Sequence, residues 1–441
     1  RMRLLPPALS VSVGLALPCA LPQVHAQDAV RLDDAEVTEL VRHAYRFVAM
    51  YNVNHKIALR LGGWNTVDVD KDLKDHTMRD IARPNNDTLY VSIPLDLRAD
   101  PMVLDLPAFD SDYASLMITG YDHYVQIPMS TRHGDFSEPT KLLVRPARSP
   151  WPDSGSIDGI DRTFEAASDF VSAVLRVMPH ANEPQRFERI VAEMERVRAI
   201  PLAEFLGDAP RSAPEIDFPE VGATDFDVFG NNLFEVLQFA FDHTVFDPKD
   251  PIDRDLLAAF APLGVVPGQP LDRSLAALAD LSRFRTAAEK LASDELGQNT
   301  DPESKRRRMF SLFRTKGDIS IDDLTHQSIL GPIGMPSEEA IYPAISTNDG
   351  QPMNAMYDYV VRMSAEDLPP AGAFWSVTLY EQETGFFVPN DRKKYSVGRN
   401  AGMKLDEAGG IEIHVAAECP SGVPPENLLP IERGDGAIGL V

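Results

Sequence analysis

The segment from Arg83 to Tyr90 places a guanidinium, two amides, a carboxylate and a phenol close together in the chain. These groups belong to Arg83, Asn85, Asn86, Asp87 and Tyr90. At the mouth of a β-domain they can orient a neutral or anionic small molecule. A carboxylate in a partly dry site can also acquire a pKa suited to proton transfer. Asp87, with Tyr90 and Arg83, is therefore a candidate catalytic group, and Asn85 and Asn86 are candidate ligand contacts.

The same run also has a purely structural interpretation. Asn and Asp side chains hydrogen-bond nearby backbone amides and thereby fix turns. On this interpretation Arg83 and Tyr90 hold a loop in place, and replacing them lowers the melting temperature without changing any response to a ligand. The residues alone leave both interpretations open.

A looser version of this segment's ending returns near the C-terminus. An acidic residue precedes a tyrosine by three positions in both places, as Asp87 with Tyr90 and as Glu339 with Tyr342. A strand-like stretch, a Leu-Pro step and a second strand with an aromatic residue before a serine follow each pair. The recurrence predicts two related β-units around a different middle region, with either one site or a pseudo-symmetric pair.

The second strand of each unit should have two unlike faces, because side chains alternate across a strand. Trp375 is then expected in the core, while Ser376 and Tyr380 share the opposite face. That polar face and Tyr342 are candidate ligand contacts. Thr131-Arg132, on a later turn of the first unit, adds a second guanidinium if the two loops meet.

The apolar pattern divides the chain into a signal and three further regions. Strand-like alternation predicts a β-rich domain over 27–150, after a first helix that begins near Asp33. Helical spacing predicts a mainly helical region over 151–330, in which Phe170, Val174 and Met178 share a helix face. Strands return over 331–441. The fold class is therefore α+β, with a sandwich-like N-terminal domain, a helical middle layer and a C-terminal β-sandwich or jelly roll.

Residues 1–26 have the composition of an export signal. A basic start precedes an apolar run that ends at Val24-His25-Ala26, a small-residue cleavage site. Prolines interrupt the run, whereas a stable membrane span needs roughly 20 continuous apolar residues. We therefore expect a periplasmic or secreted protein with no stable membrane span after signal removal; a short anchor is the alternative. The chain begins with Arg rather than Met, and whether it is a fragment stays open.

Charge and cysteine content limit the partners. The formal net charge is −25, with 42 Lys and Arg against 67 Asp and Glu. Such a chain is not expected to bind nucleic acid or an anionic membrane. The basic run Lys305–Arg308 is interpreted as an ordinary charged helix face rather than a membrane-binding one. Cleavage would remove Cys19 and leave Cys419 alone, so no intramolecular disulfide is expected.

Metal and nucleophile signatures are weak. The best metal-ligand candidates are His123, His133, Asp122 and Asp135, with Asp242-His243 as a further pair, and none has a closely spaced ligand motif. No Gly-x-Ser-x-Gly elbow is present for a hydrolase nucleophile. The sequence therefore predicts no metal and leaves any cofactor unknown.

The motifs in combination resemble the bacterial exported proteins that pair a DUF1254 region with a DUF1214 region. The first region is matched by Pro84–Tyr90, Leu95–Leu97, Pro101–Leu104 and Thr131-Arg132, and the second by Glu339–Pro343, Ala373–Tyr380, Val388–Asn390 and Tyr395–Gly398. The resemblance implies a β-rich first domain, a helical middle and a β-sandwich or jelly-roll last domain, and it implies little about activity. The chain departs from the family pattern at Asp323–Gln327 and at Asn427–Pro430.

The motifs and the resemblance leave two functional hypotheses. One is an envelope protein that binds a small molecule, saccharide or lipid-like ligand in a polar pocket of its β-domains. The other is a periplasmic hydrolase or other acid-base enzyme that acts through Asp87, Tyr90 and Arg83. Asp87→Asn distinguishes the two: the enzyme hypothesis predicts that this variant stays folded but loses all turnover.

Overall fold

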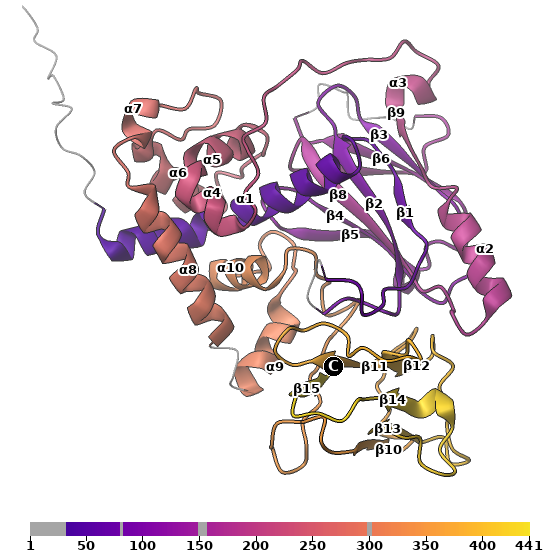
Figure 1. Cartoon of the computed structure of the whole chain (residues 1–441). Coiled ribbons are helices and arrows are strands. Elements are labelled where there is room, and N and C mark those ends of the chain that lie inside the picture. The colour runs from indigo at the N-terminus through magenta and orange to yellow at the C-terminus, as the bar shows by residue number, and fades with distance from the viewer. Residues whose placement is uncertain (1–31, 80–82, 149–156, 298–301) are drawn as a thin grey trace, which may run out of the picture.

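The computed structural model describes residues 32–79, 83–148, 157–297 and 302–441. Two β-sheets form the N-terminal domain, a group of helices lies beside them, and the C-terminal domain lies along one end of the sheets (Figure 1). This arrangement agrees with the predicted α+β class. Residues 1–26 lie outside the described residues, so the export signal stays a prediction.

The first helix, α1 (Asp34–Arg60), connects the helical group to the sheets. Asp33 begins it with a capping box, in which the Asp33 carboxylate accepts from the Glu36 amide at 2.8 Å and Glu36 accepts from the Asp33 amide at 2.7 Å. Its apolar side chains pack against α5, α6, α8 and α10. The helix predicted to begin near Asp33 is thus confirmed.

Except for α9, the helices from α4 to α10 contribute apolar side chains to the core around α1. Their bounds are α4 (Asp225–Asn231), α5 (Leu233–Asp242), α6 (Pro251–Phe260), α7 (Arg273–Ala276), α8 (Leu281–Gly297), α9 (Pro302–Ser311) and α10 (Ile321–Leu330), with a 3₁₀ turn at Ala261–Leu263. Helix α5 is apolar on most sides because it is buried in this group. The basic run lies on α9, and no helix of the described ranges is long and apolar enough to cross a membrane.

The N-terminal domain is built from two sheets that enclose one core. The first sheet has the order β1-β2-β8-β4-β5, with β1 (Asp68–Asp70), β2 (Leu89–Asp96), β4 (Ala114–Thr119), β5 (Val125–Ser130) and β8 (Phe170–Val177). The second has the order β7-β6-β3-β9, with β3 (Met102–Leu106), β6 (Thr140–Pro146), β7 (Arg162–Ala166) and β9 (Arg198–Pro201). The helices α2 (Pro184–Met194) and α3 (Leu202–Phe205) accompany these strands, and a 3₁₀ turn follows β5 at Thr131–His133.

The helical prediction for Phe170–Met178 is wrong, because Phe170–Val177 form β8, the central strand of the first sheet. Every residue of β8 is buried, so both faces of the strand carry apolar side chains and no alternation marks it. A short apolar run of this kind cannot be assigned to helix or strand by periodicity. The strands β7 and β9 also fall within the region predicted to be mainly helical.

The C-terminal domain contains two three-stranded sheets around a small core. Their orders are β10-β13-β14 and β12-β11-β15, with β10 (Tyr359–Met363), β11 (Ser376–Glu381), β12 (Ser396–Gly398), β13 (Ile411–Ala416), β14 (Leu428–Pro430) and β15 (Ile438–Leu440). Trp375 packs on this core beside Val377 and Leu379, as alternation predicted. A sandwich or jelly-roll topology stays a prediction.

Candidate functional site

A row of polar residues crosses the first N-terminal sheet near one end. The Cα partners in adjacent strands run from Asp70 to Tyr90, Arg176, Ser115 and Ser130. The residues beside this row on the same strands point the other way, into the core between the sheets; they include Leu89, Ala114, Leu116, Leu175 and Val177. The row therefore faces outward, toward the chain that leads into the C-terminal domain.

Arg176 is the central residue of this row and is 6% exposed. Its guanidinium carbon lies 5.6 Å from the centre of the Tyr90 ring, and it hydrogen-bonds the Tyr342 phenol. Burial by itself lowers the pKa of Arg176, but the Tyr90, Tyr342 and Tyr113 phenols outweigh it and the pKa is raised. The side chain thus stays charged. Its Nε has no hydrogen-bond partner, and no carboxylate within the described residues forms an ion pair with it.

Asp87 lies in the turn before β2 and is 7% exposed. Its Oδ2 accepts a hydrogen bond of 2.6 Å from the Ser376 hydroxyl of the C-terminal domain, and its Oδ1 has no partner. Burial raises the pKa of Asp87 to about 6, although the Ser376 hydrogen bond opposes the shift. Near neutral pH this carboxyl can exchange its proton, as a general acid or base must.

Each acidic residue of the recurring motif forms hydrogen bonds with the other β-domain. Asp87 of the first unit bonds Ser376 of the second, while Glu339 of the second unit bonds the first. Glu339 Oε2 accepts from the Tyr113 hydroxyl at 3.1 Å and from the Ser130 hydroxyl at 2.8 Å. Its Oε1 lies 2.9 Å from Arg132 Nε, and its side chain is fully buried. This carboxylate therefore has the partners that a buried charge requires.

Four of the sequence-predicted residues are brought together around Asp87. Ser376 contacts it directly, and the Tyr342, Tyr380 and Tyr90 phenols lie within electrostatic range of one another. The Tyr380 hydroxyl donates to the Pro84 carbonyl at 3.0 Å. The polar face predicted for the strand of Ser376 thus meets the first motif.

The Asn85 side chain and the Arg83 backbone shape the turn. Asn85 Oδ1 accepts from the Asp87 amide at 2.6 Å and from the Thr88 amide at 3.3 Å, which is the structural role proposed for this run. Arg83 has a left-handed φ of +52°, and its amide donates to the Gly385 carbonyl at 2.7 Å. The Arg83 side chain is exposed, and Asn86 is half-buried beside Asp87.

The second predicted guanidinium does not join the Asp87 turn. Arg132 follows the edge strand β5 and pairs there with Glu339, whereas Asp87 precedes β2 near the opposite edge. Thr131 Oγ1 accepts from the Ala114 amide at 3.3 Å. Sequence reasoning instead missed Arg176, because its segment was assigned to a helix. The signal was one charged residue inside an eight-residue run that is apolar apart from Ser172.

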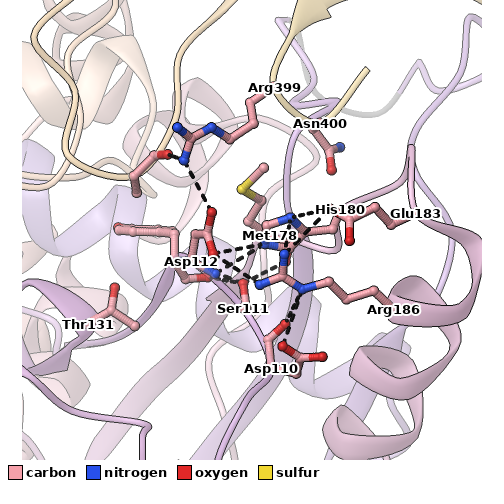
Figure 2. A network of polar contacts seen from close by, with 12 residues as sticks. Asp110, Ser111, Asp112, Thr131, Met178, His180, Glu183, Arg186, Arg399 and Asn400 are labelled. Atoms are coloured by element: carbon pink, nitrogen blue, oxygen red, sulfur yellow. Dashed lines mark hydrogen bonds and ion pairs between the residues drawn. The ribbon is translucent and has the colours of Figure 1, made fainter. Parts of the chain in front are cut away.

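A second polar network joins the same two domains next to α2 (Figure 2). Arg186 donates to the Asp112 carboxylate at 3.0 Å, and Arg399 of the C-terminal domain reaches Asp112 at 3.2 Å. His180, 2% exposed, accepts from the Asp112 amide through Nε2 at 3.1 Å. Burial, with Arg186 nearby, lowers the pKa of His180, so the imidazole is neutral and suits an acceptor. Thr131 stands apart from this network in Figure 2.

Two of the predicted metal-ligand candidates, His123 and Asp135, bond to other protein groups. His123 Nδ1 lies 2.7 Å from the Ser328 hydroxyl and its Nε2 lies 2.9 Å from the Pro332 carbonyl. Asp135 pairs with Arg162 at 2.5 Å. No group of three or more His, Cys, Asp or Glu in the described part of the chain is placed to hold a metal ion.

Comparison with known proteins gives the family. A model described as "Protein of unknown function (DUF1254)" matches residues 64–201, and one described as "Protein of unknown function (DUF1214)" matches residues 339–440. No curated protein matches the chain.

Among solved structures, the VPA0106 protein from Vibrio parahaemolyticus is 20% identical with a TM-score of 0.70, over 92% of this chain and 94% of that one. At this identity it shows a shared fold alone. An uncharacterized protein from Burkholderia cenocepacia is 13% identical with a TM-score of 0.36 over 94% of each chain, too low to carry an argument. The two matched regions show that this chain belongs to the family of proteins that carry a DUF1254 and a DUF1214 domain.

Proposed function

We propose that this chain is an exported envelope protein that binds a small molecule with an anionic group at the polar cluster between its β-domains. The ligand classes expected from the sequence, saccharides and lipid-like molecules, both include members that carry a carboxylate. Arg176 supplies the cation, and the Tyr90 and Tyr342 phenols flank it.

The buried guanidinium of Arg176 is the observation that supports this proposal. A buried charge is costly unless an opposite charge or full hydrogen bonding compensates it. Glu339, in the same junction, has Arg132 as such a partner, whereas Arg176 has only phenols, a distant carbonyl and an unpartnered Nε. A ligand carboxylate would accept two parallel N–H bonds from this guanidinium. Tyr342, 58% exposed, lies on the side from which a ligand would enter.

A thermal-shift experiment with matched ligand pairs tests the proposal. Each pair differs in one carboxylate: glucuronate with glucose, and decanoate with decanol. We expect only the carboxylates to stabilise the protein, by about 2.7 kcal/mol at a concentration of 100 times Kd. An equal response to both members of each pair contradicts the proposal.

Variants locate the response at the cluster. Arg176→Gln should abolish the shift, and Tyr342→Phe, which removes one hydroxyl from an exposed ring, should weaken binding by about tenfold. Arg132→Gln is the control: it removes the partner of Glu339 and lowers stability, but the ligand response should persist. Loss of the response in Arg132→Gln alone would move the site away from Arg176.

An acid-base enzyme is the second candidate, and the environment of Asp87 favours it. The pKa of Asp87 is raised to about 6, and the Ser376 hydroxyl lies 2.6 Å from its carboxylate. Such a carboxyl can move a proton near neutral pH. A panel of small esters and glycosides tests this function: Asp87→Asn should abolish any turnover and preserve the fold, and unchanged turnover in that variant contradicts it.

A further inference from the structure

The opposite end of the first N-terminal sheet carries a second group of chemically active side chains. Phe170 and Asp96 are Cα partners there, whereas Arg176 and Tyr90 are partners at the candidate site. The six-residue step from Phe170 to Arg176 along β8 separates the two ends by about 20 Å. The group is therefore distinct from the cluster around Arg176.

An aspartate–histidine pair lies at the centre of this second group. His243, which follows α5, places Nδ1 2.8 Å from Asp169 Oδ2, and the two side chains are 19% and 17% exposed. The Asp169 amide also donates to the His243 carbonyl at 2.9 Å, so the backbone fixes the pair. Because a carboxylate can only accept, Nδ1 carries the proton, and Nε2 presents a lone pair whenever the ring holds a single proton.

Aromatic rings surround this pair. The His243 ring centre lies 4.6 Å from that of Phe239 and 5.1 Å from that of Phe170. Phe218 lies 5.5 Å from Phe239 and 5.7 Å from Phe170, with Trp64 at 6.4 Å from Phe218. Phe218 is 40% exposed although it is a large apolar side chain. A flat apolar molecule could stack against these rings if the Phe218 ring moves outward.

Phe218 belongs to a long segment without helix or strand, between Phe205 at the end of α3 and Asp225 at the start of α4. Long irregular segments in compact domains commonly cover binding sites. This one is fixed on both sides of Phe218: Arg98 donates to the Pro214 carbonyl at 3.1 Å, and Tyr51 donates to the Pro219 carbonyl at 2.6 Å. These bonds anchor the backbone on both sides of Phe218, so an outward motion of the ring needs only a rotation of its side chain.

The other polar groups of this cluster are already engaged. The Tyr121 hydroxyl lies 2.7 Å from His55 Nε2, and burial lowers the pKa of His55 to about 3, so this histidine is neutral and accepts from the phenol. Arg98 pairs with Asp96 at 2.7 Å, and its guanidinium lies 5.0 Å from the centre of Phe170. That cation disfavours a cationic ligand on the same ring, and the two carboxylates disfavour an anionic one. His243 Nε2 is left as an acceptor with no polar partner in the described structure.

We propose that the rings of Phe170, Phe218 and Phe239 and the Nε2 acceptor of His243 form a second binding site, for a neutral aromatic alcohol such as a phenol. The aromatic body stacks beneath Phe218, and the hydroxyl donates to His243. Asp169 keeps the imidazole in the tautomer that accepts this hydrogen bond.

Calorimetric titration with two matched probes tests the site in the whole chain. p-Cresol can donate a hydrogen bond, and 4-methylanisole has a similar ring without a donor. We expect saturable binding of one p-cresol per chain, with 4-methylanisole about tenfold weaker because the hydrogen bond is lost. Absence of saturable p-cresol binding, or equal affinity for both probes, overturns the proposal.

Two variants report on the two parts of the site. His243→Phe keeps a ring and removes the acceptor, and Phe218→Ala removes a partly exposed ring; each should weaken p-cresol binding by about tenfold or more. His414→Phe, at a histidine of the C-terminal domain, and Tyr342→Phe, at the first site, should leave it unchanged. Unchanged affinity in His243→Phe overturns the role of the imidazole, and unchanged affinity in Phe218→Ala overturns the location.

Discussion

Asp87→Asn should make the protein more stable at alkaline pH than the parent chain. The carboxyl is 7% exposed, and burial raises its pKa from the ordinary 3.8 to about 6. Between these values the folded protein binds a proton that the unfolded chain has lost. Stability linked to Asp87 is therefore complete below about pH 3.8 and is lost as the pH rises through 6. Asparagine has no charge to bury, so the free energy of unfolding of the variant should not show this decrease.

The size of the effect follows from the shift in pKa. At about 1.36 kcal/mol per unit, a rise from 3.8 to about 6 corresponds to about 3 kcal/mol in all. About half of this, ~1.4 kcal/mol, falls between pH 5 and pH 8. The Ser376 hydroxyl can donate to the asparagine oxygen as it does to Asp87 Oδ2. The parent chain should thus lose about 1.4 kcal/mol more than Asp87→Asn over this interval.

Guanidinium unfolding at pH 5, 6, 7 and 8 measures the difference between the two proteins. The many histidines titrate alike in both, so their contributions cancel in the comparison. Asp135→Asn is the control, because Asp135 is buried but pairs with Arg162 at 2.5 Å, and removing it should lower stability at pH 8. Parallel stability curves for the parent chain and Asp87→Asn between pH 5 and 8 would refute the view that a charge is buried without compensation at this position.

Three further outcomes follow from the domain junction and the core. Glu339→Gln should weaken the contact between the β-domains by about 1–3 kcal/mol, because Arg132 loses its carboxylate, and limited proteolysis should then separate the domains faster. The lowered pKa of His180 means that junction stability is present above pH 6.5 and declines below it; the hydrogen-exchange protection of the Ala181 amide, which donates to Asn400, should therefore fall in acid relative to its intrinsic exchange rate, but not in His180→Gln. Leu175→Ala should cost about 2–5 kcal/mol in chemical unfolding if this residue lies in a central strand, and a cost under 1 kcal/mol would contradict that position.

Much of the fold follows from local patterns in the sequence. Asp33 and Glu36 form the helix start that their types predict, and strands such as Met102–Leu106 lie in the region predicted to be β-rich. The alternation around Trp375 also predicts which side chains enter the core and which meet the first domain. These elements share one property: a single buried face that imposes its period on the residues.

Phe170–Val177 were assigned wrongly because this strand is buried on both faces rather than on one. The second sheet covers one face and the chain before the C-terminal domain covers the other, so most of its residues are apolar and no alternation marks them. Arg176 was missed with it. Its importance depends on Tyr90 and Tyr342, which are far away in the sequence, and on the lack of a carboxylate, and only three-dimensional neighbours reveal either property.

The recurring motif explains why the candidate site lies between domains rather than inside one. Each acidic residue binds a hydroxyl of the other unit: Asp87 takes Ser376, and Glu339 takes Tyr113 and Ser130. The ring of Tyr113 also meets the ring of Phe374, its equivalent before the second serine, at 5.9 Å. The two contacts differ in one respect, because Glu339 has a cation beside it and Asp87 has none among its hydrogen-bond partners. One side of the junction can therefore hold the domains together, while the other retains a carboxyl and, at Arg176, a guanidinium that a ligand could use.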